Sequence, residues 1–252
     1  MSWLEIFALA LLPAFLLLDF FNPPPKSVRT RWWRTRAFAV TALNFCLALF
    51  VGQAWGNWMG GAHLFNGATL GTFGGAVVGV VVYEFFHYWY HRSAHRIGWL
   101  WRLGHQMHHS AESLDAWGAY YLHPVDTALF TTLSSLVLFP LLGLSPEAGG
   151  LAAATLTFLG IFQHANVRTP RWLGYLIQCP ESHAVHHART VHAFNYADLP
   201  LWDMVFGTYC NPRSGRDERR LQGFYDGASS RILSMLFFRD VSAPAQKQGG
   251  GR

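Results

Sequence analysis

Histidines gather in three short segments of the sequence. The segments are HYWYHRSAH at residues 87–95, HQMHH at 105–109 and HAVHH at 183–187. Because residues three and four apart share one face of a helix, His87, His91 and His95 form a stripe. We likewise expect each HxxHH segment to direct its three imidazoles at one point. Imidazole binds Fe, Zn, Cu and Ni, so the spacing predicts metal binding. The candidate ligands are His91, His95, His105, His108, His109, His183, His186 and His187.

The number of histidines indicates two metal ions. One tetrahedral zinc needs about four ligands, and eight or nine converging imidazoles exceed that number. Soluble di-iron proteins hold their metals with Glu-x-x-His motifs. We expect no such Glu in the His clusters here, which predicts an all-imidazole site. His87 is either a metal ligand or a residue that contacts one. For His63, His123 and His192 the favoured interpretation is a side chain without a role in metal binding.

Membrane helices are the elements predicted to position these histidines. The chain has 252 residues, of which 51% are apolar and only 13% are charged. The usual charged share is roughly 25%. This composition excludes a disordered chain and a disulfide scaffold, and it argues against an ordinary soluble enzyme. The three cysteines, Cys46, Cys179 and Cys210, form no CxxC pair and are expected to be free thiols.

Five apolar segments are predicted to cross the membrane, for which about 20 apolar residues are needed. They are Trp3–Phe21, Ala37–Trp55, Phe65–Phe86, Leu122–Leu142 and the short Ala148–Phe162. The first is expected to be a retained anchor, because a signal peptide would begin with basic residues. The last two are expected to form a hairpin across residues 143–147. The predicted fold class is an all-α integral membrane protein with about four to five transmembrane helices and a cytosolic helical cap that holds the di-metal site.

The basic residues orient this topology. Lys and Arg collect on the cytoplasmic side of membranes, and all 19 lie in residues 26–36, 92–102 and 168–252. Five alternating spans place these segments on one side. We therefore expect an inner or plasma membrane protein with the His site and the C-terminus in the cytoplasm. The net charge of +5 suits a membrane surface, and no nucleic-acid binding is expected.

Three units are expected along the chain. Residues 1–64 form N-terminal helices with a basic loop, 65–212 form the catalytic unit, and 213–252 form a cytoplasmic tail. Within the tail, the apolar residues 231–238 are too short to span and are expected in the membrane interface. Residues 242–252 are expected to be disordered.

Around the histidines the sequence resembles the fatty acid hydroxylase/sterol desaturase superfamily. The resemblance rests on the three His segments in their order, followed by Asn195-Tyr196 and LWDMVFGTY at 201–209, and it covers about residues 83–212. The pattern HxxxH, HxxHH and HxxHH of that family falls on the eight candidate ligands. The segment QHAN at 163–166 also resembles the family and makes His164 an expected ninth ligand. Family members with a second His in this segment have that His at the position of Arg168 in this chain. One iron therefore either has an open position or takes a ligand from His123 or His192.

This resemblance implies an integral-membrane oxidoreductase with two non-haem irons. Such an enzyme uses O2 as co-substrate and external electrons to hydroxylate or desaturate a lipid C–H bond. The implied lipid is a fatty acyl chain, a sterol, a sphingoid base or a carotenoid. A separate ferredoxin or cytochrome b5 with its reductase is the expected electron donor. Imidazole sites also accept Zn, so zinc can replace iron in purified samples.

Carboxylates are expected behind the ligands, because ligating imidazoles donate their other N–H to an acceptor. Glu84, at a membrane boundary, and Asp203 are the leading candidates, and Glu112, Asp115 and Glu181 are the others. The aromatic segment at residues 202–209 is expected to pack within the cap rather than to touch the substrate. Its residues are Trp202, Phe206, Gly207 and Tyr209.

The alternative function is that of a His-rich membrane metal-binding protein or a metal transporter without oxygenase activity. A transporter would place His and carboxylates inside the spans along a path, whereas here they lie mostly at or beyond the membrane edge. A haem subunit would need facing axial ligands, usually one per helix and within the bilayer. A zinc hydrolase would need an HExxH motif, which the sequence does not contain.

Overall fold

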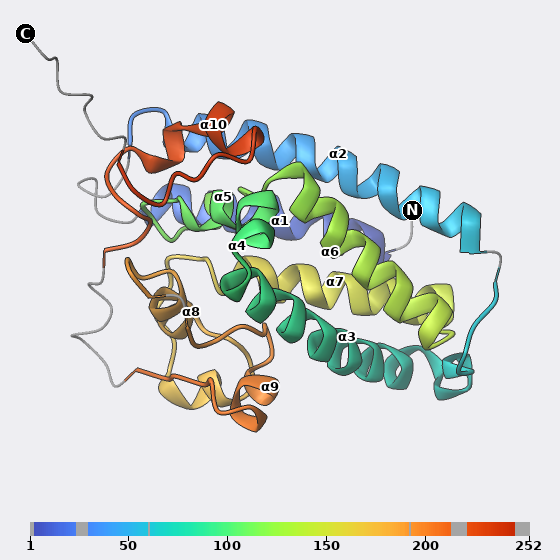
Figure 1. Cartoon of the computed structure of the whole chain (residues 1–252). Coiled ribbons are helices and arrows are strands. Elements are labelled where there is room, and N and C mark those ends of the chain that lie inside the picture. Colours follow the sequence, from blue (N-terminus) through green and yellow to red (C-terminus); the bar gives the residue numbers. More distant parts are fainter. Residues whose placement is uncertain (1–2, 24–29, 60, 192, 213–220, 245–252) are drawn as a thin grey trace, which may run out of the picture.

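The computed structural model describes residues 3–23, 30–59, 61–191, 193–212 and 221–244 (Figure 1). Over these residues the chain is helical, and its single β-type contact is an isolated bridge between Ala188 and Gln222. The predicted all-α fold class is confirmed. His192 and most of the tail predicted to be disordered lie outside the described residues.

Apolar helices make up the body of the molecule. They are α1 (Trp3–Phe21), α2 (Trp33–Met59), α3 (Gly71–Arg96), α6 (Pro124–Leu136), which continues into the π-helical turn η5 (Val137–Leu141), and α7 (Pro146–Phe162). Each predicted span overlaps one of these helices; α2 extends beyond both predicted ends, whereas α3 begins later than the predicted Phe65 and extends beyond the predicted Phe86. Among the described residues, the stretches 33–59, 67–96 and 124–141 are long and apolar enough to cross a membrane. Ala10–Phe21 and Pro146–Phe162 are shorter apolar helices.

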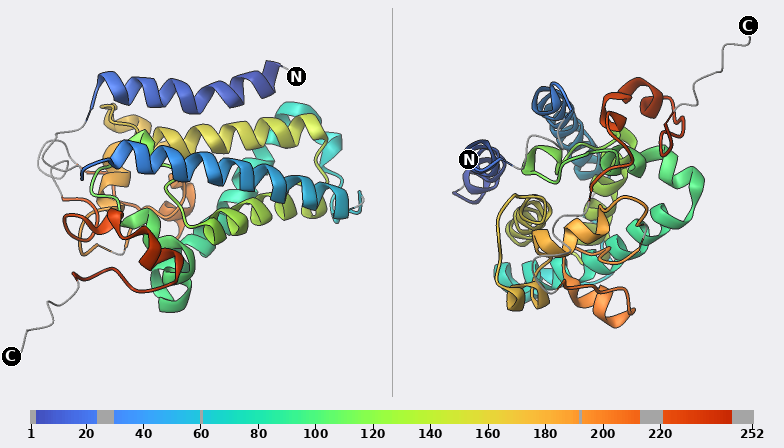
Figure 2. Two further views of the ribbon diagram at one scale, coloured as in Figure 1. Left: turned by 90° about the horizontal axis from the view of Figure 1, so that it is seen from above. Right: turned by 90° about the vertical axis from the view of Figure 1, so that its left-hand side faces the viewer.

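The long helices lie side by side (Figure 2), with α7 packed against both α1 and α3, and α2 packed against α6. Glycines allow the close approach of α3 to its neighbours. A Cβ added to Gly75 would lie 2.9 Å from the Cβ of Ala148, and one added to Gly79 would lie 2.8 Å from Cδ1 of Leu144. Small residues let membrane helices pack closely, so the Gly-rich composition of α3 follows from its central position.

A tight turn joins η5 to α7. Gly143 has a φ of 61°, and its N–H donates to the Phe139 carbonyl at 2.7 Å. The Ser145 hydroxyl then caps α7 by accepting from the Ala148 N–H at 3.2 Å, and Pro146 begins the helix. The hairpin predicted across residues 143–147 is confirmed.

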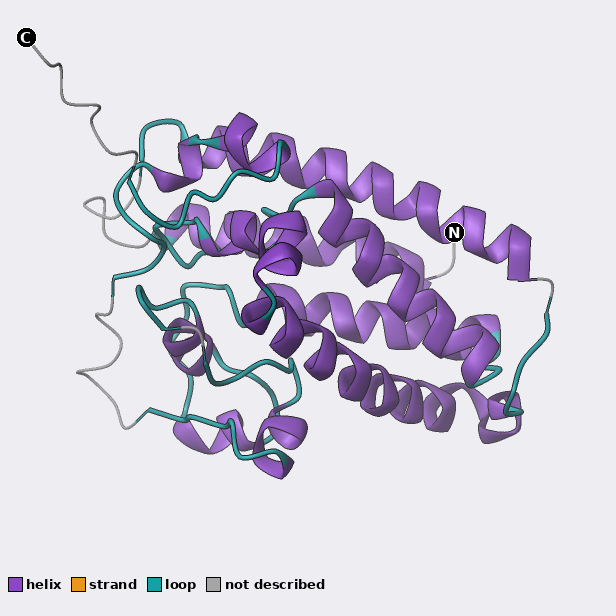
Figure 3. Cartoon of the chain, in the orientation of Figure 1, coloured by secondary structure: helices purple, strands orange, loops and turns teal. Residues whose placement is uncertain are grey.

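A cap of short helices and loops covers one end of the bundle, beyond the C-terminal end of α3 (Figure 3). It contains α4 (Gly98–Leu100), the π-helical turn η3 (Trp101–His105), α5 (Gln106–His109), α8 (Pro180–His186) and α9 (Pro200–Val205). Two of the predicted ligands lie at the end of α3 and one directly after α7, and the others lie in or beside η3, α5 and α8. The cap therefore brings together histidines that are far apart in the sequence.

Aromatic side chains hold α9 against α3. Trp202 and Phe206 pack against Tyr88 and Tyr196, and the Trp202 indole N–H donates to the Val81 carbonyl at 3.0 Å. The Tyr209 hydroxyl donates to the Gly174 carbonyl. These contacts agree with the predicted packing role of the segment.

Buried polar contacts fasten the C-terminal segment to the cap. Ser229 donates its N–H and its hydroxyl to the Glu112 carboxylate at 3.0 and 2.7 Å. In α10 (Ile232–Leu236), Met235 is fully buried, whereas Leu233 and the following Phe237 are each 72% exposed. One side of residues 231–238 thus packs on the protein, and membrane contact through the other side stays a prediction.

Candidate metal centre

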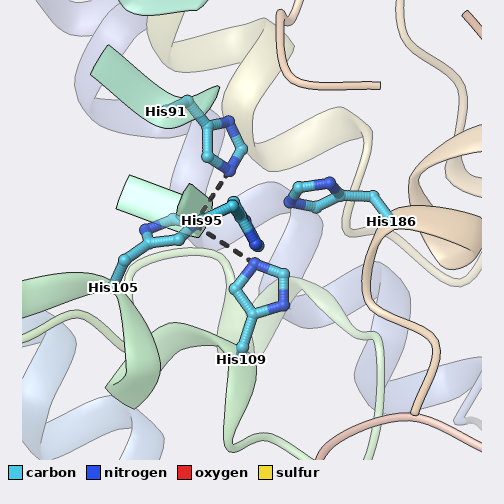
Figure 4. Close-up of side chains that lie close together, drawn as sticks. All are labelled: His91, His95, His105, His109 and His186. Atoms are coloured by element: carbon cyan, nitrogen blue, oxygen red, sulfur yellow. Dashed lines mark hydrogen bonds between the residues drawn. The ribbon is translucent and has the colours of Figure 1, made fainter. Parts of the chain in front are cut away.

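All nine predicted ligands come together, in two groups. The first contains His91, His95, His105, His109 and His186, and the second contains His108, His164, His183 and His187. Within each group the ligand nitrogens lie within 4.8 Å of one another. The rings are buried apart from His95, which is half-buried. Figure 4 shows the rings of the first group pointing toward a common centre, with His186 facing the others from α8.

The division into groups corrects the expectation that each HxxHH segment serves one point. His105 and His109 belong to the first group, whereas His108 belongs to the second. Successive residues of a helix are rotated by about 100°, so neighbouring histidines cannot reach the same ion, while residues four apart can. In the other HxxHH segment His186 joins the first group and its two companions join the second. Each HxxHH segment therefore links the two groups.

Hydrogen bonds show that the first group fits a cation. His91 Nδ1 lies 2.6 Å from the Tyr196 carbonyl oxygen, and His105 Nδ1 lies 3.1 Å from Asp126 Oδ2. Both partners are acceptors, so each Nδ1 carries the proton and each Nε2 presents a lone pair. The two Nε2 atoms are nevertheless 2.8 Å apart. Lone pairs at this distance repel one another unless a cation lies between them.

The second group likewise presents Nε2 lone pairs that face one another. His164 Nδ1 donates to the Gly160 carbonyl at 2.7 Å, which leaves its Nε2 as a lone-pair donor. That Nε2 lies 3.1 Å from His108 Nε2 and 3.0 Å from His183 Nε2. His187 Nε2 is buried and has no hydrogen-bond partner among the described residues. The donor atoms present therefore fit a metal ion here as well.

Burial keeps these cap imidazoles neutral. It lowers the pKa of His108, His109, His183 and His187 well below the usual value, and neighbouring imidazoles lower it further. Burial also lowers the pKa of His164 to about 4. Neutral imidazole is the form that binds metals, so these rings are in the ligating state at neutral pH.

The acceptors behind the ligands differ from those predicted. Asp203 accepts from the N–H groups of Tyr196 and Ala197 at 2.9 and 2.8 Å and from the Thr208 hydroxyl, and no His ring contact is described for it. Asp203 supports the ligands indirectly, because it fixes the backbone of Tyr196, whose carbonyl accepts from His91. Burial raises the pKa of Asp203 to about 6.

The other predicted carboxylates anchor the backbone. Glu112 binds Ser229, Asp115 accepts from the Trp33 indole, and Glu181 accepts from Thr169. Asp126, the carboxylate that faces His105, was not among the predicted acceptors. An acidic residue in an otherwise apolar helix is the feature that identifies it, because such residues are rarely tolerated there without a role.

Three of the remaining histidines lie outside both groups. His123 caps α6: its Nδ1 accepts from the Val125 N–H at 3.1 Å. His63 is exposed, with its Nδ1 at 3.0 Å from the Gly61 carbonyl. His87 stacks on His91 with 5.5 Å between ring centroids, but its Nδ1 lies 3.3 Å from Glu84 Oε2. Glu84 and His87 thus form a Glu-x-x-His pair, which corrects the expectation that the clusters contain none.

Asp126→Asn is expected to weaken metal binding by about 10- to 100-fold, the usual effect of losing a carboxylate behind a ligating imidazole. The variant retains the size of the side chain but removes the charge that orients His105 and favours its Nε2 as a ligand. Metal affinity measured by competition with a calibrated chelator tests this. Asp226→Asn, which alters an aspartate paired with Arg189 at the surface, is the control and should bind metal as the unaltered chain does. Equal affinities of the two variants would contradict the assigned role of Asp126.

Comparison with known proteins gives a family match. The sequence model of the fatty acid hydroxylase family matches residues 76–208. Ornithine lipid hydroxylase OlsE of Rhizobium tropici is 34% identical over 141 residues, which cover 54% of this chain and 42% of that protein. Sphinganine C4-monooxygenase 1 of Arabidopsis thaliana is 27% identical over 137 residues, 53% of each chain.

Alkylglycerol monooxygenase of Homo sapiens is 33% identical over 133 residues, which cover 50% of this chain and 28% of that protein. The match therefore spans about half, or less, of the length of these relatives. No solved structure matches the chain.

Proposed function

Because this chain belongs to the fatty acid hydroxylase family, we propose that it is a membrane-bound oxygenase that hydroxylates or desaturates a C–H bond of a lipid. The observation that carries the proposal is the convergence of nine buried or half-buried imidazoles at the end of a bundle with membrane-length helices. The names of the relatives point the same way, since they describe a hydroxylase of ornithine lipid and monooxygenases of sphinganine and alkylglycerol.

The two His groups are proposed to hold two irons. When bound, these irons would supply the activation of O2 that an unactivated C–H bond requires. Among the described residues the first group offers five imidazoles and the second offers four, so the second ion would have one imidazole fewer from this part of the chain. Arg168 stands at the position where members of the family with a second His in this segment have it. His123 is not a replacement, because it caps α6 instead.

Backbone carbonyls of the cap fix the orientation of the imidazoles. His91 and His186 donate from Nδ1 to the carbonyls of Tyr196 and Phe194 at 2.6 and 2.9 Å. These hydrogen bonds hold each Nε2 toward its group, and burial of the rings keeps bulk water away from them. The protein therefore supplies rigid ligand positions and a dry environment, as an oxygenase needs.

The position of the site suits a substrate that stays in the bilayer. His91 and His95 lie in the last turns of α3, within the membrane-length stretch 67–96. A lipid chain at the edge of the hydrocarbon region can thus approach the ligands without leaving the membrane. Fatty acyl, sterol, sphingoid and carotenoid chains all meet this condition, and we propose a lipid of this general class.

Partners and orientation are part of the same proposal. Electrons would come from a separate ferredoxin or cytochrome b5 with its reductase. The basic segments would face the cytoplasm of an inner or plasma membrane, together with the His groups. Residues 65–212 would form the catalytic unit, with residues 1–64 as additional membrane helices and 213–252 as the tail. A transporter is not favoured, because the ligating His residues gather in two compact groups rather than along a path through the helices.

Lipid profiling under ¹⁸O2 tests the proposed function. Cells that produce the protein should contain a lipid heavier by one ¹⁸O atom, or lighter by two hydrogens, than its precursor. Cells that produce the His183→Ala variant at the same level should not, because the second group would lose a ligand. Identical lipid profiles in the two strains, with iron bound to the unaltered chain, would overturn the proposal.

A further inference from the structure

Glu84, His87 and Asp198 form a third group of potential ligands. Their ligand atoms lie within 4.8 Å of one another, and the group shares no residue with the two His groups. Glu84 and His87 stand one turn apart on α3, and Asp198 lies in the loop that precedes α9 (Figure 1). The group thus joins the end of a membrane-length helix to the cap.

The distances suit ligands of a single ion. His87 Nδ1 lies 3.3 Å from Glu84 Oε2 and 4.0 Å from Asp198 Oδ1. Two ligands bonded to one ion at about 2.0–2.2 Å lie at most about 4.4 Å apart, and about 3.4 Å apart in a tetrahedral site. Both separations fall inside this limit without movement of a side chain.

One oxygen of Glu84 has no partner. The Glu84 side chain is fully buried, and its Oε2 accepts from the N–H of Asp198 at 2.8 Å and faces His87. Its Oε1 is also buried, yet it accepts no hydrogen bond in the part of the chain that the structure describes. A buried carboxylate oxygen without a partner is costly, so this atom points to a ligand that binds beside it.

The charge of the group calls for a cation. With His87 neutral, as a metal ligand must be, the two carboxylates would carry two negative charges, which one divalent ion would neutralise. Burial, together with the charge of Glu84, raises the pKa of Asp198 to about 7, as expected where two carboxylates lie close together with little water. Gln163 donates to Asp198 Oδ1 at 2.7 Å and so fixes the direction of that carboxylate.

We propose that Glu84, His87 and Asp198 form a third metal site, separate from the two His groups. Its mixed oxygen and nitrogen donors suit a divalent ion such as Zn²⁺, Mn²⁺ or Fe²⁺. The ion would tie α3 to the loop of residues 194–199, which supplies backbone carbonyls to His91 and His186. This inference does not rest on oxygenase activity or on iron in the His groups.

Counting and locating zinc tests the proposal. The purified full-length chain is stripped with a chelator, reloaded with Zn²⁺ and desalted, and zinc per chain is measured by mass spectrometry. We expect about three zinc ions per chain for the unaltered protein and about two for Glu84→Gln or Asp198→Asn. Glu112→Gln, which alters a buried carboxylate whose hydrogen bonds within the described residues go to Ser229, is the matched control and should retain about three zinc ions per chain.

Anomalous diffraction at the zinc edge locates the ions and does not depend on the variants being stable. A peak between Glu84, His87 and Asp198 in the unaltered chain supports the third site. Two zinc ions per chain, both in the His groups, would overturn the third site. The three residues would then form an ion pair in which a protonated His87 lies between the two carboxylates. Equal zinc content in Glu84→Gln and Glu112→Gln would overturn it as well.

Discussion

His186→Ala is expected to abolish lipid oxygenation and to lower bound iron by at least half. His186 is the one residue of α8 in the first His group, where it faces four imidazoles from the α3–α5 side (Figure 4). Its removal leaves that ion without a ligand on one side. Removing a group that hydrogen-bonds to a metal ligand already lowers metal affinity or activity about 10- to 100-fold. The loss of the ligand itself should therefore reduce turnover by at least about a hundredfold. Iron per chain and substrate-dependent O2 uptake are the measurements.

His123→Ala is the matched control for this prediction. His123 is also a buried histidine of the cap end, but it caps α6 and lies outside both His groups. The variant should lose the capping contribution, about 1 kcal/mol of stability, and the contacts of His123 with Leu236 and Phe238, but it should retain its iron and its turnover. Unchanged iron and full turnover in His186→Ala would refute the assignment of the first group.

Asp203→Ala is expected to destabilise the cap strongly. The carboxylate of Asp203 is fully buried and accepts from two backbone N–H groups, those of Tyr196 and Ala197. The substitution leaves both donors buried without an acceptor, at about 1–3 kcal/mol each. A chain of this size should then unfold at a temperature several degrees lower. Thermal unfolding of the purified protein in detergent measures this effect.

The same substitution should also loosen the first His group, because the Tyr196 carbonyl that accepts from His91 loses its support. Asp226→Asn provides the control, since Asp226 is 90% exposed in its pair with Arg189 and exposed ion pairs contribute little. If Asp203→Ala and Asp226→Asn unfold at the same temperature, the anchoring role of Asp203 is wrong.

Periodic and compositional features made the fold predictable. Long apolar segments and their flanking basic residues identify the five helices, and Gly143 with Ser145 marks the hairpin that the structure contains. The ends of α2 and α3 were not predictable from hydropathy, because α2 continues past the predicted apolar span at both ends and α3 continues past Phe86 to the cap. There, packing against other elements decides where a helix ends.

The ligand set was predictable, but its division between two groups was not. The spacing of HxxHH predicts that three imidazoles meet at one point, whereas the rotation between His108 and His109 directs them to different groups. The acceptors behind the ligands depend on tertiary contacts. Three of them are the backbone carbonyls of Gly160, Phe194 and Tyr196, which carry no sequence signature, and Asp126 is 21 residues from His105. Only its position in an apolar helix identifies it.

The alternation of ligands along α5 and α8 has a consequence for metal uptake. Each of these short helical segments carries ligands for both groups, so an ion in one group restrains the helix that serves the other. The conformational entropy lost when the first ion binds does not have to be lost again for the second, and the two affinities are coupled. We therefore expect cooperative loading: at limiting metal the population divides into empty and filled molecules, and a chelator removes both ions together.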